Sequence, residues 1–272
     1  NKYKPSCIFN LAAETHVDRS IDNPLNFINS NIIGTFNLIE TARNYWENLN
    51  ISEKNIFRFH HVSTDEVFGS LDKNKFFNES SNYDPRSPYS ASKASSDHLV
   101  NSWYHTFGLP IVITNCSNNY GPYQFPEKLI PLTILKALNQ EEIPIYGDGS
   151  NERDWLYVDD HVNAIITTLG KSEVGKTYCI GGNSVKTNLQ VVKEICKILN
   201  CIKPINYPYE DLIKFVKDRP GHDKRYAIDP KKIKSELKWS PNFEFDTGLR
   251  NTVEWYLNNL DWCKSVLSKA NY

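Results

Sequence analysis

The stretch IFRFHHVSTDEVFG, residues 56–69, decides the fold. Its first part predicts a strand, and Thr64, Asp65 and Glu66 follow that strand before Gly69. Neighbouring residues in a regular strand point to opposite faces, so the two acids can share one pocket only where the pleat breaks. In open parallel sheets, ligands bind outside the carboxyl ends of the strands. The stretch therefore predicts a ligand site at a strand end; a helix cap or an acidic turn is the alternative interpretation.

Similar short apolar runs recur along the chain and alternate with longer amphipathic stretches. This alternation is typical of strand–helix–strand units around a parallel sheet. Strands are predicted at residues 7–13, 56–63, 110–116 and 177–180, and helices at residues 24–48, 88–107, 126–139, 159–169, 188–199 and 247–259. Helix start signals stand at Asn23-Pro24, at Asp159 and at Thr187 or Asn188. The expected fold class is α/β, with a doubly wound parallel sheet.

The pattern of predicted strands, helices and loops changes after about residue 116. Before it, strands and helices alternate regularly. Beyond it lie loops marked by Pro and Gly, short strands, separated helices and a final helix rich in Trp and Tyr. We expect one domain at residues 1–116 and a smaller α/β region at residues 117–272, some segments of which can return to the first domain's sheet.

The amino-acid composition limits the classes of protein to which this chain can belong. Of the 272 residues, 40% are hydrophobic and 23% charged, which is ordinary for a globular protein, and the formal net charge of -1 favours neither a nucleic-acid nor a membrane partner. No apolar run approaches the roughly 18 residues that span a bilayer. The six cysteines form no C-x-x-C pair, which argues against a zinc site and suits a reducing cytosol. We expect a cytoplasmic protein without a bound metal.

The predicted helix at residues 88–107 carries Tyr89 and Lys93. A spacing of four places both side chains on one helical face. A nearby positive charge stabilises a phenolate and lowers the pKa of the phenol from its usual value near 10. Tyr89 can then exchange a proton with a hydroxyl group of a ligand. The alternative is a surface tyrosine beside a lysine.

Further polar clusters follow the other predicted strands and loops. Residues 10–20 form a strand that enters a polar turn, where small side chains let a planar ligand approach the backbone. Later loops supply Arg and Lys for phosphates and Tyr for stacking. Each cluster taken alone also fits an ordinary structural loop.

In their order and spacing these clusters resemble the extended short-chain dehydrogenase/reductase superfamily and, within it, the dTDP-glucose 4,6-dehydratases. The resemblance extends from Asn10 to the C-terminal helix. Related epimerases and decarboxylases share Tyr89 and Lys93 but generally lack the Asp65–Glu66 pair. UDP-rhamnose-type enzymes of plants keep the pair, and Gly221-His222 favours the dTDP-sugar enzymes. The alternatives are a UDP-glucose 4,6-dehydratase, another nucleotide-sugar epimerase or decarboxylase, and a non-catalytic scaffold.

The resemblance implies conversion of dTDP-glucose to dTDP-4-keto-6-deoxyglucose and water, with transient hydride transfer to NAD+. It implies catalytic roles for Thr64, Asp65, Glu66, Tyr89 and Lys93. It implies NAD contacts from Leu11, Ala12, Ala13, Glu14, Thr15, Ser30, Tyr89, Lys93 and Asn119. It implies substrate contacts from Thr15, Thr64, Asn118, Lys128, Leu129, Pro144, Ile145, Tyr146, Arg153, Asn188, Asp218, Arg219, Pro220, Gly221 and His222.

The resemblance also implies a domain plan. Residues 1–116 would be part of an NAD-binding Rossmann domain, and residues 117–272 mainly a nucleotide-sugar-binding region. Members of the family open with a glycine-rich turn, whereas no glycine precedes Gly34 here. We therefore expect two strand–helix units, about 60 residues, to lie outside this sequence. The family further implies a homodimer through a four-helix contact, which would use apolar residues on a second face of the helices at 24–48 and 88–107.

Overall fold

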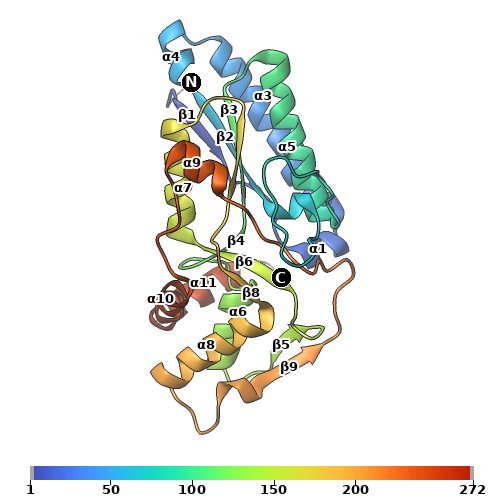
Figure 1. Ribbon diagram of the computed structural model, residues 1–272, viewed down its shortest axis with the longest axis vertical. Coiled ribbons are helices and arrows are strands. Elements are labelled where there is room, and N and C mark those ends of the chain that lie inside the picture. Colours follow the sequence, from blue (N-terminus) through green and yellow to red (C-terminus); the bar gives the residue numbers. More distant parts are fainter. Residues whose placement is uncertain (1–2, 270–272) are drawn as a thin grey trace. The chain divides into compact units, whose positions relative to one another are not determined.

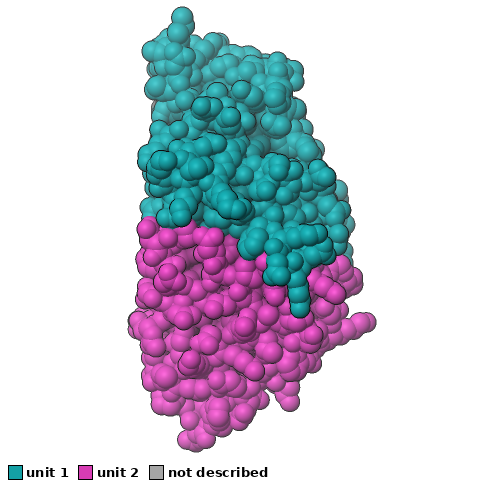
Figure 2. All heavy atoms as spheres, in the orientation of Figure 1, with its two compact units in different colours: residues 1–117, 162–181, 226–240 teal, residues 118–161, 182–225, 241–272 magenta. Residues whose placement is uncertain are grey.

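A computed structural model describes residues 3–269 of the chain. The chain divides into two compact units (Figure 2). Unit 1 comprises Asn1–Ser117, Val162–Gly181 and Tyr226–Ser240, and unit 2 comprises Asn118–His161, Gly182–Arg225 and Pro241–Tyr272. Two segments beyond residue 117 therefore belong to the first unit.

Unit 1 is built on a parallel sheet of four strands in the order β1-β2-β3-β7 (Figure 1). The strands are β1 (Cys7–Asn10), β2 (Arg58–Thr64), β3 (Ile111–Cys116) and β7 (Lys176–Ile180). Each predicted strand is present, and the predicted α/β class is confirmed. The order has a physical cause, because parallel neighbours need crossover connections and the helices between the strands provide them.

Helices cover both faces of this sheet (Figure 1). On one face α3 (Gly34–Glu47) and α5 (Pro88–Phe107) pack on β2 and β3. That core contains Ile39, Ala42, Phe57, Phe59, Val100, Leu109, Ile111 and Ile113. On the other face lie α9 (Lys231–Leu237) and the part of α7 (Val158–Lys171) that belongs to unit 1. Unit 1 also contains α1 (Val17–Asp22), α4 (Ile51–Ile56) and the 3-10 helix η2 (Asp65–Phe68).

Helix α5 has the predicted bounds because strong local signals fix both of its ends. Ser87 accepts a hydrogen bond from the Ser90 N–H at 3.0 Å, and Pro88 occupies the first turn, where no backbone N–H is needed. Gly108 ends the helix with φ 72°, a left-handed conformation that glycine adopts without strain.

The predicted helix at residues 24–48 is present without a break from Pro24 to Glu47, and it contains a π turn that the sequence did not predict. The structure has α2 (Pro24–Phe27), a π-helix η1 (Ile28–Ile33) and then α3. The wide π turn contains Asn31, a buried amide that hydrogen-bonds to groups outside its own helix. Such turns occur mostly as local insertions in helices. Hydrophobic periodicity does not reveal them, because the apolar pattern continues through the turn.

Unit 2 has two small sheets and four helices among its described residues. The first sheet joins β4 (Asn118–Tyr120), β6 (Glu152–Tyr157) and β8 (Val185–Thr187); the second pairs β5 (Ile143–Tyr146) with β9 (Ile213–Val216). The helices are α6 (Leu129–Leu138), α8 (Asn188–Ile202), α10 (Phe245–Asn258) and α11 (Leu260–Lys269), with the 3-10 turn η3 (Tyr209–Leu212). Thr187 caps α8, as one of the start signals predicted. All of these elements except β8 contribute to one apolar core.

Candidate catalytic and nucleotide-sugar site

Three strands of unit 1 end at the same edge of its sheet. Asn10 at the end of β1 is paired in register with His61, and Thr64 at the end of β2 with Cys116 at the end of β3. Ligands of open parallel sheets bind at this carboxyl edge. The edge carries the polar turns that the sequence singled out.

The turn after β2 places two acids directly beyond the strand. At Thr64 the strand ends and η2 begins, and the Thr64 hydroxyl accepts a hydrogen bond from the Glu66 N–H at 3.2 Å. Gly69 ends the turn with φ 82°, and a Cβ there would lie 2.5 Å from the Asp84 carbonyl oxygen. The alternative interpretation as a helix cap is thus true of Thr64. A cap at Thr64 is compatible with a ligand site, because the strand ends there and the two neighbouring acids, Asp65 and Glu66, can then face one pocket.

Tyr89 and Lys93 are buried on the inner face of α5. Tyr89 is 8% exposed and Lys93 4%, so the alternative of a surface tyrosine beside a lysine does not hold. The Lys93 ammonium donates to the Val62 carbonyl oxygen of β2 at 2.9 Å. The Tyr89 ring meets Phe27 edge-to-face, with centroids 6.3 Å apart. These contacts direct both side chains toward the end of β2.

The expectation that Lys93 lowers the pKa of Tyr89 is wrong for this structure. Burial raises the pKa of Tyr89 well above its usual value, and the charge of Glu66 raises it further, with smaller effects of Cys116 and Asp65. Hydrogen bonding by Thr64 acts in the opposite direction. Loss of water around the phenol and the nearby groups Glu66, Cys116 and Asp65 therefore set the direction of the shift. The same result places Tyr89 within electrostatic range of Thr64, Asp65 and Glu66.

Beneath this pair lies a buried polar network that the sequence analysis missed. Its centre is Asp97, one helical turn after Lys93 on α5, and its other members come from β2, β3 and the segment before α5. The spacing of four between Lys93 and Asp97 was a usable signal. The partners were not predictable, because they lie between 14 and 36 positions away in the chain.

The loop after β1 contains five of the residues predicted to contact NAD, at positions 11–15. Leu11 and Ala12 are exposed, and small side chains leave the backbone there accessible. The buried Asn31 side chain fixes the loop: its oxygen accepts from the Glu14 N–H at 2.8 Å, and its amide donates to the Glu14 carbonyl at 3.0 Å and to Ser92 at 2.8 Å. The loop is thus exposed at Leu11 and Ala12 and is tied through Asn31 to α5, the helix that carries Tyr89. Thr15 and Ser30, also predicted contacts, are exposed.

In unit 2, several predicted substrate contacts gather around His222. Its Nδ1 lies 2.6 Å from an Asp218 carboxylate oxygen, and the same oxygen accepts from the Arg219 N–H at 2.9 Å. The Tyr146 ring at the end of β5 meets the His222 ring edge-to-face. Burial lowers the pKa of His222, and the charges of Arg219 and Arg153 lower it further against the effect of Asp218. A neutral imidazole beside two guanidinium groups suits a phosphate-bearing ligand.

The other predicted residues of unit 2 lie on separate elements. Lys128 precedes α6 and Leu129 begins it, so backbone N–H groups at this helix start can bind an anion. Ile145 is buried in β5, so only its backbone can meet a ligand. The remaining positions are partly or fully exposed: Asn118 and Asn119 in β4, Pro144 in β5, Asn188 at the start of α8, and Pro220 and Gly221 in the loop before His222.

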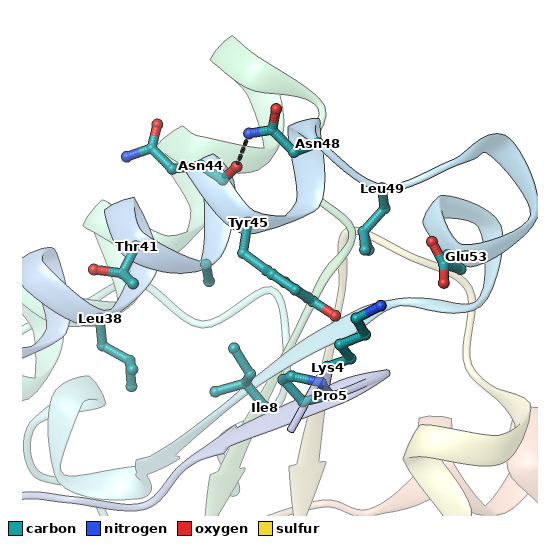
Figure 3. A pocket seen from close by; sticks show the side chains of 11 residues that line it. Lys4, Pro5, Ile8, Leu38, Thr41, Asn44, Tyr45, Asn48, Leu49 and Glu53 are labelled. Carbon is teal, nitrogen blue, oxygen red and sulfur yellow. Dashed lines mark hydrogen bonds between the residues drawn. The ribbon is translucent and has the colours of Figure 1, made fainter. Parts of the chain in front are cut away.

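A cavity of about 770 Å³ lies elsewhere in unit 1, between β1 and α3 (Figure 3). Ile8, Leu38 and Tyr45 point into it, and Lys4 and Glu53 stand at its side (Figure 3). None of the residues predicted for catalysis or ligand binding lines this cavity. It is therefore not part of the candidate site.

Among the residues that the structure describes, no helix has both the length and the apolar composition that crossing a bilayer requires.

Comparisons with known proteins agree with the geometry. Residues 1–252 match the family described as GDP-mannose 4,6 dehydratase. The chain is 54% identical over 272 residues to a dTDP-glucose 4,6-dehydratase of Neisseria meningitidis serogroup B, with 98% of this chain and 77% of that protein covered.

Two solved structures are similar in both sequence and fold. A dTDP-glucose 4,6-dehydratase from Bacillus anthracis in complex with NAD is 45% identical, with a TM-score of 0.82; the match covers 96% of this chain and 75% of that one. A dTDP-glucose 4,6-dehydratase from Streptomyces venezuelae with NAD and TYD bound is 40% identical, with a TM-score of 0.87; the match covers 96% of this chain and 76% of that one.

Proposed function

This chain belongs to the GDP-mannose 4,6 dehydratase family and, within it, to the dTDP-glucose 4,6-dehydratases, and from that premise we propose how its residues divide the reaction. The reaction converts dTDP-glucose to dTDP-4-keto-6-deoxyglucose and water. NAD supplies the hydride acceptor at the first step and returns the hydride at the last. The observation that carries the proposal is that the buried Tyr89 lies within hydrogen-bonding range of Thr64 and within electrostatic range of Asp65 and Glu66.

Oxidation at C4 begins when Tyr89 takes the proton of the sugar 4-hydroxyl. The Thr64 hydroxyl, fixed by its contact with the turn of η2, holds the 4-oxygen as charge develops. Lys93 provides positive charge beside the phenol from a position set by Val62. The ketone formed at C4 then acidifies the hydrogen on C5.

Elimination of water uses the two acids in opposite protonation states. Glu66 removes the C5 proton as a base, and Asp65 gives a proton to the departing 6-hydroxyl. Asp65 is almost fully buried and Glu66 is not, and burial favours the neutral form of a carboxyl group. Two close carboxyl groups in unequal surroundings can be divided in this way. After hydride reaches C6, Glu66 returns a proton to C5.

The two halves of the mechanism are electrostatically coupled. Burial and then the charge of Glu66 raise the pKa of Tyr89 most, and Asp65 adds a smaller effect in the same direction. A protonated Asp65 removes one of these negative charges. The state that is ready to eliminate water is therefore also the state in which Tyr89 ionises more easily.

Unit 2 supplies the residues that we propose bind the nucleotide sugar. Tyr146 can stack on a ring, Arg153 and Arg219 can bind the diphosphate, and the start of α6 at Lys128 offers a further anion site. The six cysteines are all free thiols, which supports a reducing, cytoplasmic location.

Hydrogen transfer within one molecule tests the proposed reaction. The full-length protein with NAD is given dTDP-glucose deuterated at C4, and UDP-glucose labelled in the same way in a parallel reaction. Because the hydride removed from C4 is returned to C6, we expect deuterium at C6 of a 4-keto product from dTDP-glucose. A sugar inverted at C4 would indicate an epimerase, and faster turnover of UDP-glucose would contradict the assigned substrate.

We propose that a second copy of the chain covers an apolar face of η1 and α3. Phe27 and Ile39 are buried against unit 1, whereas Ile28, Ile33 and Phe36 remain 40–47% exposed. Phe36 contacts Trp103 of α5, with ring centroids 5.9 Å apart, so both helices contribute to this face. Two copies of α3 and α5 would form a four-helix contact.

A charge on this face should separate the copies. A symmetric dimer carries a substitution twice, so Phe36→Asp should raise the dissociation constant by at least about a hundredfold. Sedimentation velocity measures the change. Phe76→Asp, which alters a similarly exposed phenylalanine in a loop of unit 1, is the matched control and should leave association unchanged. A monomeric unchanged protein, or a Phe36→Asp protein that associates normally, would contradict the dimer.

A further inference from the structure

Asp97 is a buried acid that the proposed mechanism does not use. It is 1% exposed and follows Tyr89 and Lys93 on α5 at intervals of four. Residues at such intervals share one face of a helix. All three side chains therefore form one column along the inner face of α5, with the proton carrier at one end and a carboxyl group at the other.

The surroundings of Asp97 identify it as an anion. Its Oδ2 accepts from the Ser63 hydroxyl at 2.8 Å, the Tyr83 hydroxyl at 3.0 Å and the Asn115 amide at 3.2 Å. Its Oδ1 lies 3.2 Å from His61 Nε2. Burial raises the pKa of Asp97, but the contact with His61, the charge of Lys93 and the hydrogen bond from Ser63 together leave that pKa below its usual value.

His61 does not neutralise this anion. Its Nδ1 lies 3.1 Å from the Asn10 amide nitrogen, which can only donate, so Nδ1 accepts and the ring proton is on Nε2, facing Asp97. Burial, followed by the charge of Lys93, lowers the pKa of His61 and keeps the ring neutral. The imidazole therefore orients the carboxylate and leaves its negative charge in place.

Lys93 is the cation that faces this charge. Burial lowers the pKa of Lys93, and Asp97 gives the larger of the two opposing effects, ahead of Cys116. The groups around the column are His61 and Ser63 on β2, Asn115 and Cys116 on β3, Tyr83 before α5 and Cys179 on β7, with Asp65 and Glu66 of η2 beside Tyr89. Asp97 is the carboxylate that acts on Lys93.

We propose that Asp97 is a positioning residue that keeps Lys93 protonated, and so sets the upper pH limit for proton transfer through Tyr89. The inference rests on the proposed role of Tyr89 in C4 oxidation. Without the anion, a buried lysine with one fixed carbonyl partner loses its proton at a lower pH. In the proposed mechanism Lys93 supplies the positive charge beside the phenol, and a neutral amine would not supply it.

Asp97→Asn tests the proposal because it removes the charge and keeps the shape. The measurement is the single-turnover rate of C4 oxidation in the full-length protein, followed by nicotinamide absorbance across a range of pH. We expect the alkaline limb of the profile to move to lower pH by about one unit, since opposite charges at such range shift a pKa by one unit or more. Substrate affinity should not change. Asp97→Glu, which keeps the charge, should restore most of the limb.

Tyr83→Phe is the matched control. It removes one hydrogen bond to the same Asp97 oxygen and alters no charge at neutral pH, so it should lower the unfolding midpoint and leave the pH profile in place. An unmoved alkaline limb in Asp97→Asn, or an equal movement in Tyr83→Phe, would overturn the proposal. If the unchanged protein does not oxidise its substrate at C4, the proposed function fails instead.

A second measurement needs no change at residue 97. Lysines labelled with ¹⁵N at Nζ report their charge by NMR, and the Lys93 signal is the one lost in Lys93→Arg. We expect a charged Lys93 at neutral pH. A neutral amine there would refute the role of Asp97, even if Asp97→Asn does not fold.

Discussion

Changing Glu66 to Gln should stop the loss of water while oxidation at C4 continues. Removal of a positioned general base costs about 10²- to 10⁴-fold in rate, and Glu66 is the base proposed for the C5 proton. The full-length protein should therefore accumulate reduced nicotinamide and a 4-keto sugar that keeps its 6-hydroxyl. Absorbance of the nicotinamide and mass spectrometry of the sugar measure the two products separately.

Asp65→Asn should also stop the loss of water, because the departing 6-hydroxyl then receives no proton. Exchange of the C5 hydrogen with solvent distinguishes the roles of the two acids. In deuterated water, Glu66 can still exchange the C5 hydrogen when Asp65 is absent, so Asp65→Asn should show C5 exchange without elimination. Glu66→Gln should show neither. Asp72→Asn, a change in an exposed acid paired with Lys75, should behave as the unchanged protein. The same C5 exchange in Asp65→Asn and Glu66→Gln would contradict the separate roles proposed for the two acids.

Tyr89→Phe should lower the rate of C4 oxidation by about 10²- to 10⁴-fold, and with it every later step. The change removes only the hydroxyl, so the ring should keep its contact with Phe27 and the fold its stability. The Thr64 hydroxyl keeps its hydrogen bond from the Glu66 N–H. Nucleotide-sugar affinity should be nearly unchanged, since Tyr89 acts on the reacting hydroxyl. Single-turnover absorbance and calorimetry measure the two quantities.

Tyr104→Phe is the control for this variant, because Tyr104 lies on the same helix outside the site. It should oxidise the sugar at the normal rate. A Tyr89→Phe protein with a near-normal rate of C4 oxidation would show that another group takes the proton, and the mechanism would then have to be reassigned.

Several helices and strands show which parts of the fold could be predicted from the sequence. Helix α5 has the predicted bounds because Ser87, Pro88 and Gly108 act within a few residues of its ends. The four strands of unit 1 were predictable because each is a short apolar run between turn signals. The strands of unit 2 are mostly three or four residues long, too short for periodicity to distinguish them from loops.

The residues of the candidate site were likewise predictable in part. Tyr89, Lys93, Thr64, Asp65 and Glu66 were chosen from residue type and spacing, and the structure brings them to one buried place at the end of β2. The direction of the Tyr89 pKa was predicted wrongly, because spacing on a helix shows a nearby lysine but neither burial nor acids from another segment. Asn31 and Asp97 were missed because their partners are distant in sequence.

By itself the sequence determined the α/β alternation, the ends of the main helix and the set of reactive side chains, since these depend on residue type, capping and spacing over a few positions. Only the tertiary structure decided which groups are buried together, where a π turn lies within the helix that α3 continues, and how Asp97, His61 and Lys93 interact. These features depend on contacts between segments many residues apart and on the removal of water from them. Local patterns carry no information about either.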